Sequence, residues 1–305
     1  MHRIGILGLD SSHPSAFASV LERMPSMTIS GVWDGGAVRE PATVQSFAQT
    51  HDATIVDSPA SLVDHVDGVM VLSVNWDTHV SLATPFLEAG VPVLIDKPLA
   101  GDLESLARLE EVAGQTPLYG GSALGYHPTL LEWPTGGAKR QLWVAGYEHP
   151  FYYGAHLTST ARRLAGADWR SVIPTNQPGQ TVQVTFENDV VATIRFDGGD
   201  DPGAFGLLDV GEVTRTTLIE GSNSDERRSM YESYLAGFRA TIEGSIDESA
   251  RLLDGARLLL ATRGALDHTE RLEPTSPTLA DVHADGRSFL ESYQPYVAHS
   301  GSSTN

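Results

Sequence analysis

Short apolar runs separated by amphipathic stretches occupy the first 121 residues of the chain. Apolar runs without polar alternation are typical of parallel strands that are buried on both faces. They predict strands at residues 4–9, 27–33, 54–56, 68–74, 91–95 and 118–119. The intervening stretches predict helices at residues 14–24, 43–49, 61–65, 78–89 and 102–113. Strands that alternate with helices at this spacing predict right-handed βαβ units in a doubly wound parallel sheet.

Beyond residue 121 the pattern changes to strands that alternate or are rich in β-branched residues. These predict strands at residues 141–147, 181–187, 190–196 and 213–219, with a hairpin turn at Asn188-Asp189. Helical spacing predicts helices at residues 154–165, 226–243 and 247–268. We therefore expect an α/β protein with a Rossmann domain at residues 1–121 and an α+β domain with a mostly antiparallel open sheet at residues 122–297. Residues 298–305, rich in Ser and Gly, predict a disordered tail.

Composition narrows the classes of function. The formal charge of −19 argues against nucleic acid as a partner, because each phosphate contact would have to overcome a repulsive field. The absence of cysteine excludes disulfides, thiolate metal sites and cysteine nucleophiles. The chain contains no apolar run of 18 residues, so we expect no membrane span. Its first residues are predicted to form a strand and not a signal peptide. We expect a cytoplasmic protein.

Lys97 is the first candidate for chemistry. The chain contains two lysines, Lys97 and Lys139, and Lys97 directly follows a predicted buried strand in the sequence Asp96-Lys97-Pro98. In an open α/β sheet, ligands bind beyond the carboxyl ends of the strands, so we expect Lys97 to face a site. A strand-end lysine that extends into solvent is the alternative interpretation.

Three segments together resemble the Gfo/Idh/MocA family of oxidoreductases, named for glucose-fructose oxidoreductase and inositol dehydrogenase. They are residues 69–79, the Asp96-Lys97-Pro98 turn, and Gly154-Ala155-His156 with Gly166 ten residues after the histidine. The resemblance implies that Lys97 and His156 flank the reacting carbon of a sugar-like or cyclitol substrate, with NAD opposite. It also implies a homodimer or homotetramer that assembles through the open sheet.

The chemistry of alcohol oxidation suits these two residue types. Hydride leaves carbon while a base with a pKa near the working pH accepts the hydroxyl proton. Histidine titrates close to neutrality, whereas the pKa of lysine must first be lowered by burial. We interpret His156 as the proton acceptor and Lys97 as the donor that polarises the substrate oxygen, and the reverse assignment stays open. Asp10, His13 and His156 form an alternative metal-ligand set, but we expect no metal, because no two histidines have i, i+4 spacing.

The chain departs from the family pattern at several positions. Ser159 and Tyr152 stand where the family's helix carries aspartates, and the first glycine-rich loop reads Gly8-Leu9-Asp10-Ser11-Ser12-His13, which retains one of three glycines. We expect Asp10 to turn away and cap the following helix, so that Ser11, Ser12 and His13 meet the phosphates of the cofactor. Asp34 follows the second strand and favours NAD over NADP. The remaining candidates for cofactor contacts are Ser73, Asn75, His79 and Asp96, and those for substrate contacts are Tyr126, His127, Tyr152 and Tyr153.

The leading hypothesis is therefore an NAD-dependent oxidoreductase acting on a hydroxyl or keto carbon of a small polyol. Two alternatives follow from the altered glycine loop. One is a redox-neutral lyase or isomerase on the same scaffold, with the cofactor tightly held or lost. The other is a non-catalytic ligand-binding protein.

Overall fold

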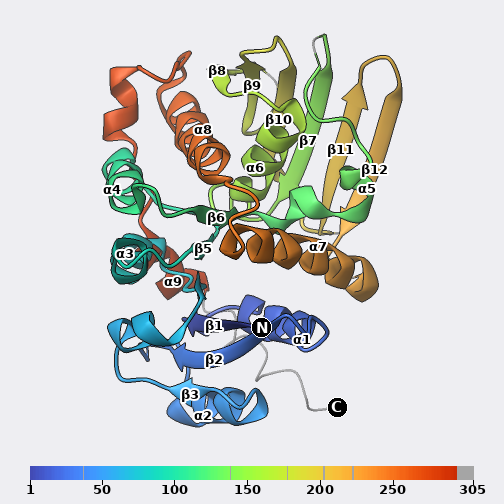
Figure 1. Cartoon of the computed structure of the whole chain (residues 1–305). Coiled ribbons are helices and arrows are strands. Elements are labelled where there is room, and N and C mark those ends of the chain that lie inside the picture. The colour runs from blue at the N-terminus through green and yellow to red at the C-terminus, as the bar shows by residue number, and fades with distance from the viewer. Residues whose placement is uncertain (37, 138, 177, 202, 222, 294–305) are drawn as a thin grey trace, which may run out of the picture.

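Two six-stranded sheets organise the computed structural model, which describes residues 1–36, 38–137, 139–176, 178–201, 203–221 and 223–293 (Figure 1). The first sheet is entirely parallel, with the order β3-β2-β1-β4-β5-β6. This doubly wound order confirms the predicted sheet. Its strands are β1 (His2–Leu7), β2 (Met27–Trp33), β3 (Thr54–Ile55), β4 (Gly68–Val71), β5 (Val93–Asp96) and β6 (Leu118–Gly121).

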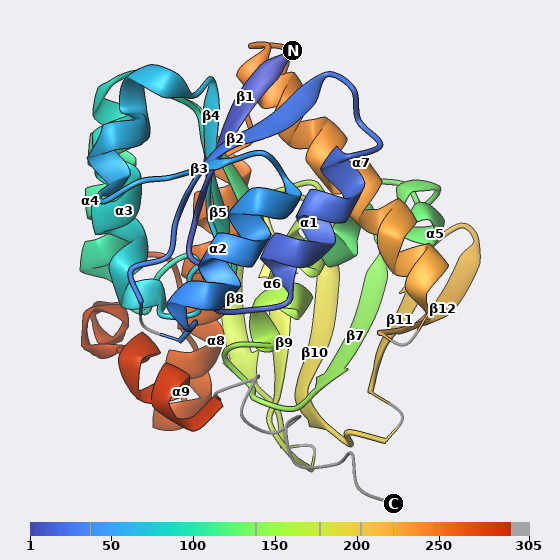
Figure 2. The same cartoon turned by 90° about the horizontal axis from the view of Figure 1, so that it is seen from below.

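Helices cover both faces of the first sheet, as Figure 2 shows. One face carries α1 (His13–Leu21), α2 (Pro41–Thr50) and α7 (Ser224–Ile242). The other carries η1 (Pro59–His65), α3 (His79–Glu88), α4 (Leu103–Ala113) and part of α8 (Ser249–His268). All four residues of β4 and of β5 are buried, which explains why these strands appear as continuous apolar runs.

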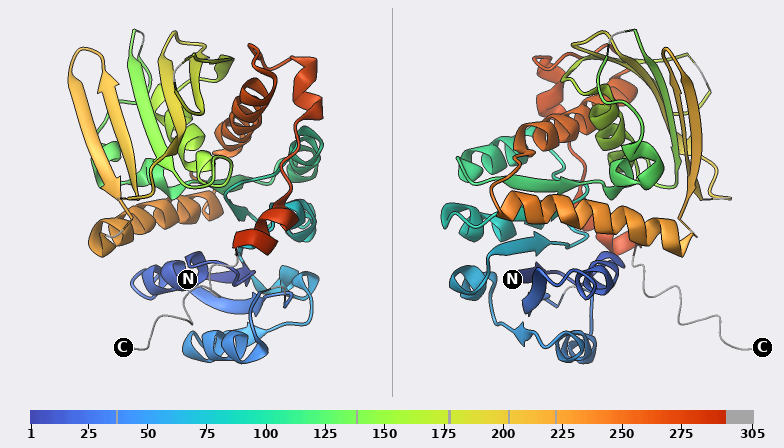
Figure 3. Two further views of the ribbon diagram at one scale, coloured as in Figure 1. Left: turned by 180° about the vertical axis from the view of Figure 1, so that it is seen from behind. Right: turned by 45° about the vertical axis from the view of Figure 1, so that its right-hand side comes forward.

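The second sheet has the order β12-β11-β7-β10-β9-β8. Helices α6 (Gly154–Ala165) and α8 cover one face, and the other face is open (Figure 3). The strands are β7 (Gln141–Tyr147), β8 (Trp169–Pro174), β9 (Thr181–Phe186), β10 (Val191–Gly198), β11 (Ala204–Val210) and β12 (Thr214–Glu220). The sheet is mostly antiparallel, as predicted, but β7 and β10 pair in parallel because α6 carries the chain back over the sheet between them.

Helix α7 joins the two halves of the molecule. It follows β12 of the second sheet, yet its side chains Tyr231, Tyr234 and Phe238 belong to the same core cluster as Ile4 and Phe17 of the first half. The predicted helix at residues 226–243 therefore exists, and it completes one face of the first sheet.

The short helix α9 (Gly286–Tyr293) returns to the first half of the chain and was not predicted. Asp77 holds its first turn, because the two carboxylate oxygens accept hydrogen bonds from the backbone N–H groups of Gly286 (3.1 Å) and Arg287 (3.0 Å). Phe289 stacks on Tyr152 with 4.5 Å between ring centroids. The expected tail at residues 298–305 lies outside the described residues.

Short elements complete the fold. They are η2 (Trp76–Thr78), η3 (Ala123–Tyr126), α5 (Pro128–Leu131) and η4 (Pro277–Asp281). None of the helices in the described parts of the chain is long and apolar enough to cross a membrane.

Candidate active site

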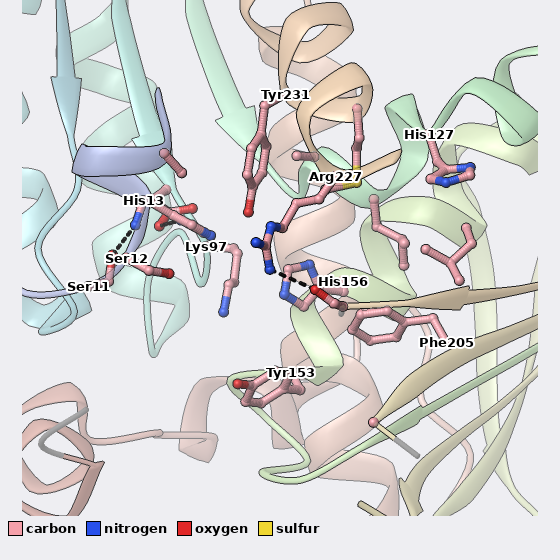
Figure 4. A pocket seen from close by; sticks show the side chains of 18 of the residues that line it. Ser11, Ser12, His13, Lys97, His127, Tyr153, His156, Phe205, Arg227 and Tyr231 are labelled. Carbon is pink, nitrogen blue, oxygen red and sulfur yellow. Dashed lines mark hydrogen bonds and ion pairs between the residues drawn. The ribbon is translucent and has the colours of Figure 1, made fainter. Parts of the chain in front are cut away.

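A pocket of about 670 Å³ lies where the carboxyl ends of the parallel strands meet the second sheet and α7 (Figure 4). Its floor and walls come from the loop before α1, the end of β5, the loop after β6, the start of α6 and the first turns of α7. Its lining includes the polar side chains of Ser11, Ser12, His13, Asp96, Lys97, His127, Glu148, Tyr152, Tyr153, His156, Arg227 and Tyr231.

Lys97 is a buried amine in this pocket. Its Nζ lies 3.1 Å from the centroid of the Tyr152 ring, 5.0 Å from that of Tyr153 and 3.5 Å from the Tyr152 carbonyl oxygen. Burial lowers the pKa of Lys97 to about 7, against the opposing effects of the Asp96 and Glu148 charges. A substantial fraction of Lys97 is therefore the free amine at neutral pH.

His156 projects from α6 into the same pocket. Its Nδ1 lies 2.6 Å from the hydroxyl oxygen of Ser122, and its ring lies beside Phe205 with 5.1 Å between centroids. Burial, followed by the charges of Lys97 and His13, lowers the pKa of His156 well below 6.5. The imidazole is therefore neutral near pH 7.

His13 is the third basic side chain of the pocket. Its Nδ1 lies 2.5 Å from Oδ2 of Asp96, and its ring stacks on Phe17 at 5.2 Å between centroids. Burial raises the pKa of Asp96, but the positive charges of His13 and Lys97 outweigh that effect, so the net shift is downward. The structure thus brings together basic groups from α1, β5 and α6, including the predicted pair Lys97 and His156.

The loop after β1 differs from expectation at Asp10. Its Oδ2 accepts a hydrogen bond from the backbone N–H of Val74 (2.9 Å), and the residue at the N-terminus of α1 is Ser12, without a side-chain cap. The carboxylate turns away from the pocket, as predicted, but the prediction that it caps the helix is wrong, because it accepts its hydrogen bond from Val74, three residues after β4. Oδ1 has no partner among the described residues, and burial raises the pKa of Asp10 to about 6.

Gly8, the one remaining glycine of the loop, stands where the backbone requires a glycine. It has φ +91°, and a Cβ atom there would lie 2.7 Å from the backbone nitrogen of Ser73. Only glycine lets the end of β1 approach the end of β4 this closely. The loop therefore retains the tight backbone turn of a dinucleotide fold although its other glycines are replaced.

Several predicted cofactor residues lie outside the pocket lining, in contacts that hold neighbouring loops. Asp34 accepts hydrogen bonds from the backbone N–H groups of Leu9 (2.8 Å) and Gly36 (3.3 Å). The Ser73 hydroxyl lies 3.0 Å from that of Thr78.

Asn75 and His79 are two further predicted cofactor residues that lie outside the pocket lining. Asn75 accepts from the N–H of Asp77 (3.1 Å) at the start of η2. His79 is fully buried between the carbonyl oxygens of Ser73 (2.9 Å) and Leu99 (3.2 Å), and burial lowers its pKa. Cofactor contact by Asp34, Ser73, Asn75 or His79 stays a prediction.

Three of the four predicted substrate residues, His127, Tyr152 and Tyr153, line the pocket. Tyr126 does not; its hydroxyl accepts a hydrogen bond from Arg251 (3.1 Å) and its ring lies beneath the guanidinium of Arg163. It is a packing residue between η3 and the helices around it.

Sequence reasoning missed the contribution of α7 and of two strand ends. Arg227 and Tyr231 extend from α7 toward the space between Lys97 and His156 (Figure 4). Glu148 follows β7 and has φ +59°, and Ser122 follows β6. The rule that selected Lys97, a polar residue directly after a buried parallel strand, also selects Ser122.

The alternative metal-ligand set is not assembled. Asp10 faces Val74, whereas His13 is paired with Asp96 and His156 with Ser122. Within the described residues, no group of three His, Asp or Glu side chains is placed to hold a metal ion.

Comparison with known proteins finds sequence matches in the first 118 residues of the chain. Residues 2–118 match the GFO_IDH_MocA model, described as an oxidoreductase family with an NAD-binding Rossmann fold. The Salmonella typhimurium oxidoreductase YceM is 34% identical over 116 residues, which are 38% of this chain and 36% of that protein. The chain thus spans about a third of the length of the curated relative it matches.

Solved structures resemble the whole fold. The myo-inositol dehydrogenase of Corynebacterium glutamicum superposes with a TM-score of 0.72 at 17% identity, over 91% of this chain and 99% of that chain. The scyllo-inositol dehydrogenase of Lactobacillus casei, solved with NAD(H) and scyllo-inositol, gives 0.67 at 14% identity, over 90% and 100%. These likenesses confirm the expected two-sheet architecture.

Proposed function

We propose that this chain, whose residues 2–118 match the NAD-binding domain of the Gfo/Idh/MocA oxidoreductases, oxidises a secondary alcohol of a sugar-like or cyclitol substrate. The observation that carries the proposal is the meeting of a buried lysine amine with a neutral histidine in one pocket, beside the loop that opens the parallel sheet. The inositol dehydrogenases with the same fold support the substrate class.

The residues present fit a dinucleotide. Gly8 provides the close approach of β1 to β4, and Ser11, Ser12 and His13 line the pocket next to Lys97, whereas the carboxylate of Asp10 is turned toward Val74. Ser11, Ser12 and His13 would hold the phosphates, and Asp34 at the end of β2 would select NAD over NADP. When bound there, NAD⁺ supplies the acceptor for the hydride that leaves the substrate carbon.

The residues of the chain then handle the proton. The substrate C–H bond breaks with its electron pair, a C=O bond forms, and the hydroxyl proton passes to the free amine of Lys97, whose pKa of about 7 suits a base at neutral pH. His156, neutral and opposite, stabilises the developing carbonyl oxygen by a hydrogen bond. These pKa shifts support the reverse of the assignment favoured on sequence.

The aromatic wall shapes the rest of the site. Tyr153 and Phe205 flank His156 with 5.9 and 5.1 Å between ring centroids, and Tyr231 lies on the side of His13. Apolar ring faces bind the C–H faces of a sugar or cyclitol ring, while the guanidinium of Arg227 and phenol hydroxyls suit its hydroxyl groups. A neutral polyol matches this mixture better than a polyanion does.

The test measures cofactor binding first and substrate oxidation second. Mass spectrometry of protein purified without added cofactor, followed by calorimetric titration of NADH, asks whether the loop binds a dinucleotide. NAD⁺ reduction is then screened by absorbance over inositols, hexoses and pentoses, with Lys97→Met as the blank. Reduction by wild type alone is expected. A dinucleotide that binds without being reduced would favour the redox-neutral lyase or isomerase, and no binding at all would favour a ligand-binding protein.

A further inference from the structure

We infer that Ser122 is a positioning residue whose hydroxyl donates to Nδ1 of His156 and so fixes the imidazole proton on Nε2. His156 would then present an N–H donor to the substrate oxygen and would have no lone pair there to act as a base. The consequence for catalysis rests on the proposed function. The position of the His156 proton, in contrast, is measured directly in the free protein.

The backbone holds Ser122 rigidly against His156. Ser122 is 3% exposed and directly follows β6, and its Oγ accepts a hydrogen bond from the backbone N–H of Leu124 (3.0 Å). Gly121 before it has φ +71°, and a Cβ there would lie 3.3 Å from Oγ of Ser159, so the end of β6 approaches α6 closely. The 2.6 Å contact between Ser122 Oγ and His156 Nδ1 is therefore built into the fold.

Counting donors and acceptors decides the direction of this contact. A hydroxyl has one proton to donate and two lone pairs, and the N–H of Leu124 already occupies one lone pair. If Nδ1 of His156 carried a proton, both lone pairs would be filled, and the buried hydroxyl proton would need an acceptor that the described residues do not provide. An unpaired buried donor is destabilising. Donation from Ser122 to Nδ1 gives both the hydroxyl proton and Nδ1 a partner.

The charges around His156 allow it a single proton. Burial lowers the pKa of His156, and so do two basic groups that face it from other elements, Lys97 directly after β5 and His13 on α1. A neutral ring whose Nδ1 accepts must carry its proton on Nε2, the nitrogen on the pocket side. An acceptor-only carboxylate in place of Ser122 would impose the opposite tautomer, as an aspartate does for a histidine that acts as a base.

The pair Lys97 and His156 thus divides one task. The substrate hydroxyl accepts a hydrogen bond from His156 and gives its proton to Lys97, so each side chain has one role. Removing the Ser122 hydroxyl lets the ring populate both tautomers and rotate, which lowers the fraction of productive His156 without touching Lys97.

Long-range ¹H–¹⁵N correlation spectra of protein with ¹⁵N-labelled histidine, at about pH 8, measure the tautomer directly. The His156 signals are assigned by their loss in His156→Asn. In wild type we expect Nδ1 unprotonated and Nε2 protonated, retained in Ser122→Thr and averaged in Ser122→Ala. A protonated Nδ1 in wild type would overturn the inference, and so would an unchanged tautomer in Ser122→Ala.

Kinetics give the second readout. Ser122→Ala should lower kcat by roughly 10-fold, within the range of a positioned hydrogen-bonding group, with the pH dependence set by Lys97 unchanged and Ser122→Thr near wild type. If Ser122→Ala misfolds, the wild-type and Ser122→Thr spectra still decide the tautomer. Failure to reduce NAD⁺ would remove the proposed function without affecting the spectra, so the two failures are distinguishable.

Discussion

Nζ of Lys97 lies 3.1 Å from the centroid of the Tyr152 ring. Tyr152 stands four residues before His156, where the resemblance expects an aspartate. A carboxylate at that position would stabilise the ammonium and raise the pKa of Lys97, whereas an aromatic face offers a weaker partner for the charge. Burial therefore dominates and lowers the pKa of Lys97 to about 7.

The pH dependence of turnover follows from this contact. Alcohol oxidation needs the free amine, so the rate should rise with pH through about 7 and level off above it. Tyr152→Asp should move this rise to higher pH by roughly 1–2 units, while Tyr152→Phe leaves it in place. Lys97→Met should lower kcat by roughly 10² to 10⁴. Initial rates of NAD⁺ reduction are measured across the pH range for wild type and the three variants. If the pH profile of Tyr152→Asp is the same as that of wild type, Lys97 is not the base.

Lys97 should also reduce the stability of the fold. Between its folded pKa of about 7 and its ordinary value of 10.5 the unfolded chain binds more protons, so the free energy of unfolding should rise with pH across this interval. Lys97→Met should stabilise the protein by roughly 1–2 kcal/mol near pH 7 and by less near pH 10. Urea denaturation at both pH values measures the difference. The exposed Lys139 provides the matched control, since Lys139→Met should give no such pH-dependent gain.

Asp10 should make dinucleotide binding depend on pH. Its pKa is raised to about 6, so it is mostly protonated at lower pH and ionised at pH 8, where its charge adds to those of Asp34 and the cofactor phosphates and is only partly offset by Arg39. We expect NADH to bind more weakly at pH 8 than at pH 5.5 by roughly 10-fold, or about 1.4 kcal/mol. Asp10→Asn should bind more tightly at pH 8 and lose most of this dependence. It preserves an acceptor for Val74, which Asp10→Gly would not.

Isothermal titration calorimetry with NADH measures these affinities, and the exposed Asp267→Asn on α8 controls for net charge. A pH dependence that persists in Asp10→Asn would assign the effect to another group. Equal affinities of wild type at both pH values would exclude Asp10 as its source.

The open face of the second sheet should carry an interface between copies of the chain. Trp143, Leu208 and Leu218 line a shallow depression on this face, and Leu218 is 58% exposed. We expect a dimer or tetramer at micromolar concentration by light scattering. Leu218→Lys should shift it toward monomer, because a buried charge disfavours association, while Ile55→Lys at the edge of the first sheet should not. A monomeric wild type would contradict the assembly.

Strands that are buried on both faces were among the elements that the sequence predicted. Strands such as β4 and β5 are continuous apolar runs, so sequence alone located them to within a few residues. Strands β8 and β11 were not predicted; in β11, Gly206 and the half-buried Leu208 weaken the alternation. Helix α9 was not predicted because Asp77, more than 200 residues away in sequence, holds its first turn. Its Phe289 packs on Tyr152, a contact that no local pattern reveals.

The site divides in the same way. Lys97 and His156 are found by motif spacing, whereas Ser122 was missed, although its place directly after β6 could have indicated it. The pKa values that assign their roles come from burial between elements far apart in sequence, and the tautomer of His156 depends on a 2.6 Å contact with a residue 34 positions away. Arg227 and Tyr231 face the pocket because of the way in which α7 packs against α1. The sequence of α7 alone therefore does not indicate which of its residues meet the substrate.

The course of α7 across both sheets has a consequence for biosynthesis. Phe17, Ile4 and Tyr119 are covered by Tyr231, Tyr234 and Phe238, which leave the ribosome more than 100 residues after β6. During translation part of one apolar face of the first sheet therefore stays uncovered until α7 is synthesised, a state that favours aggregation or chaperone binding. A nascent chain stalled after residue 121 would expose this surface, because the helix that covers it belongs, by sequence position, to the other half of the molecule.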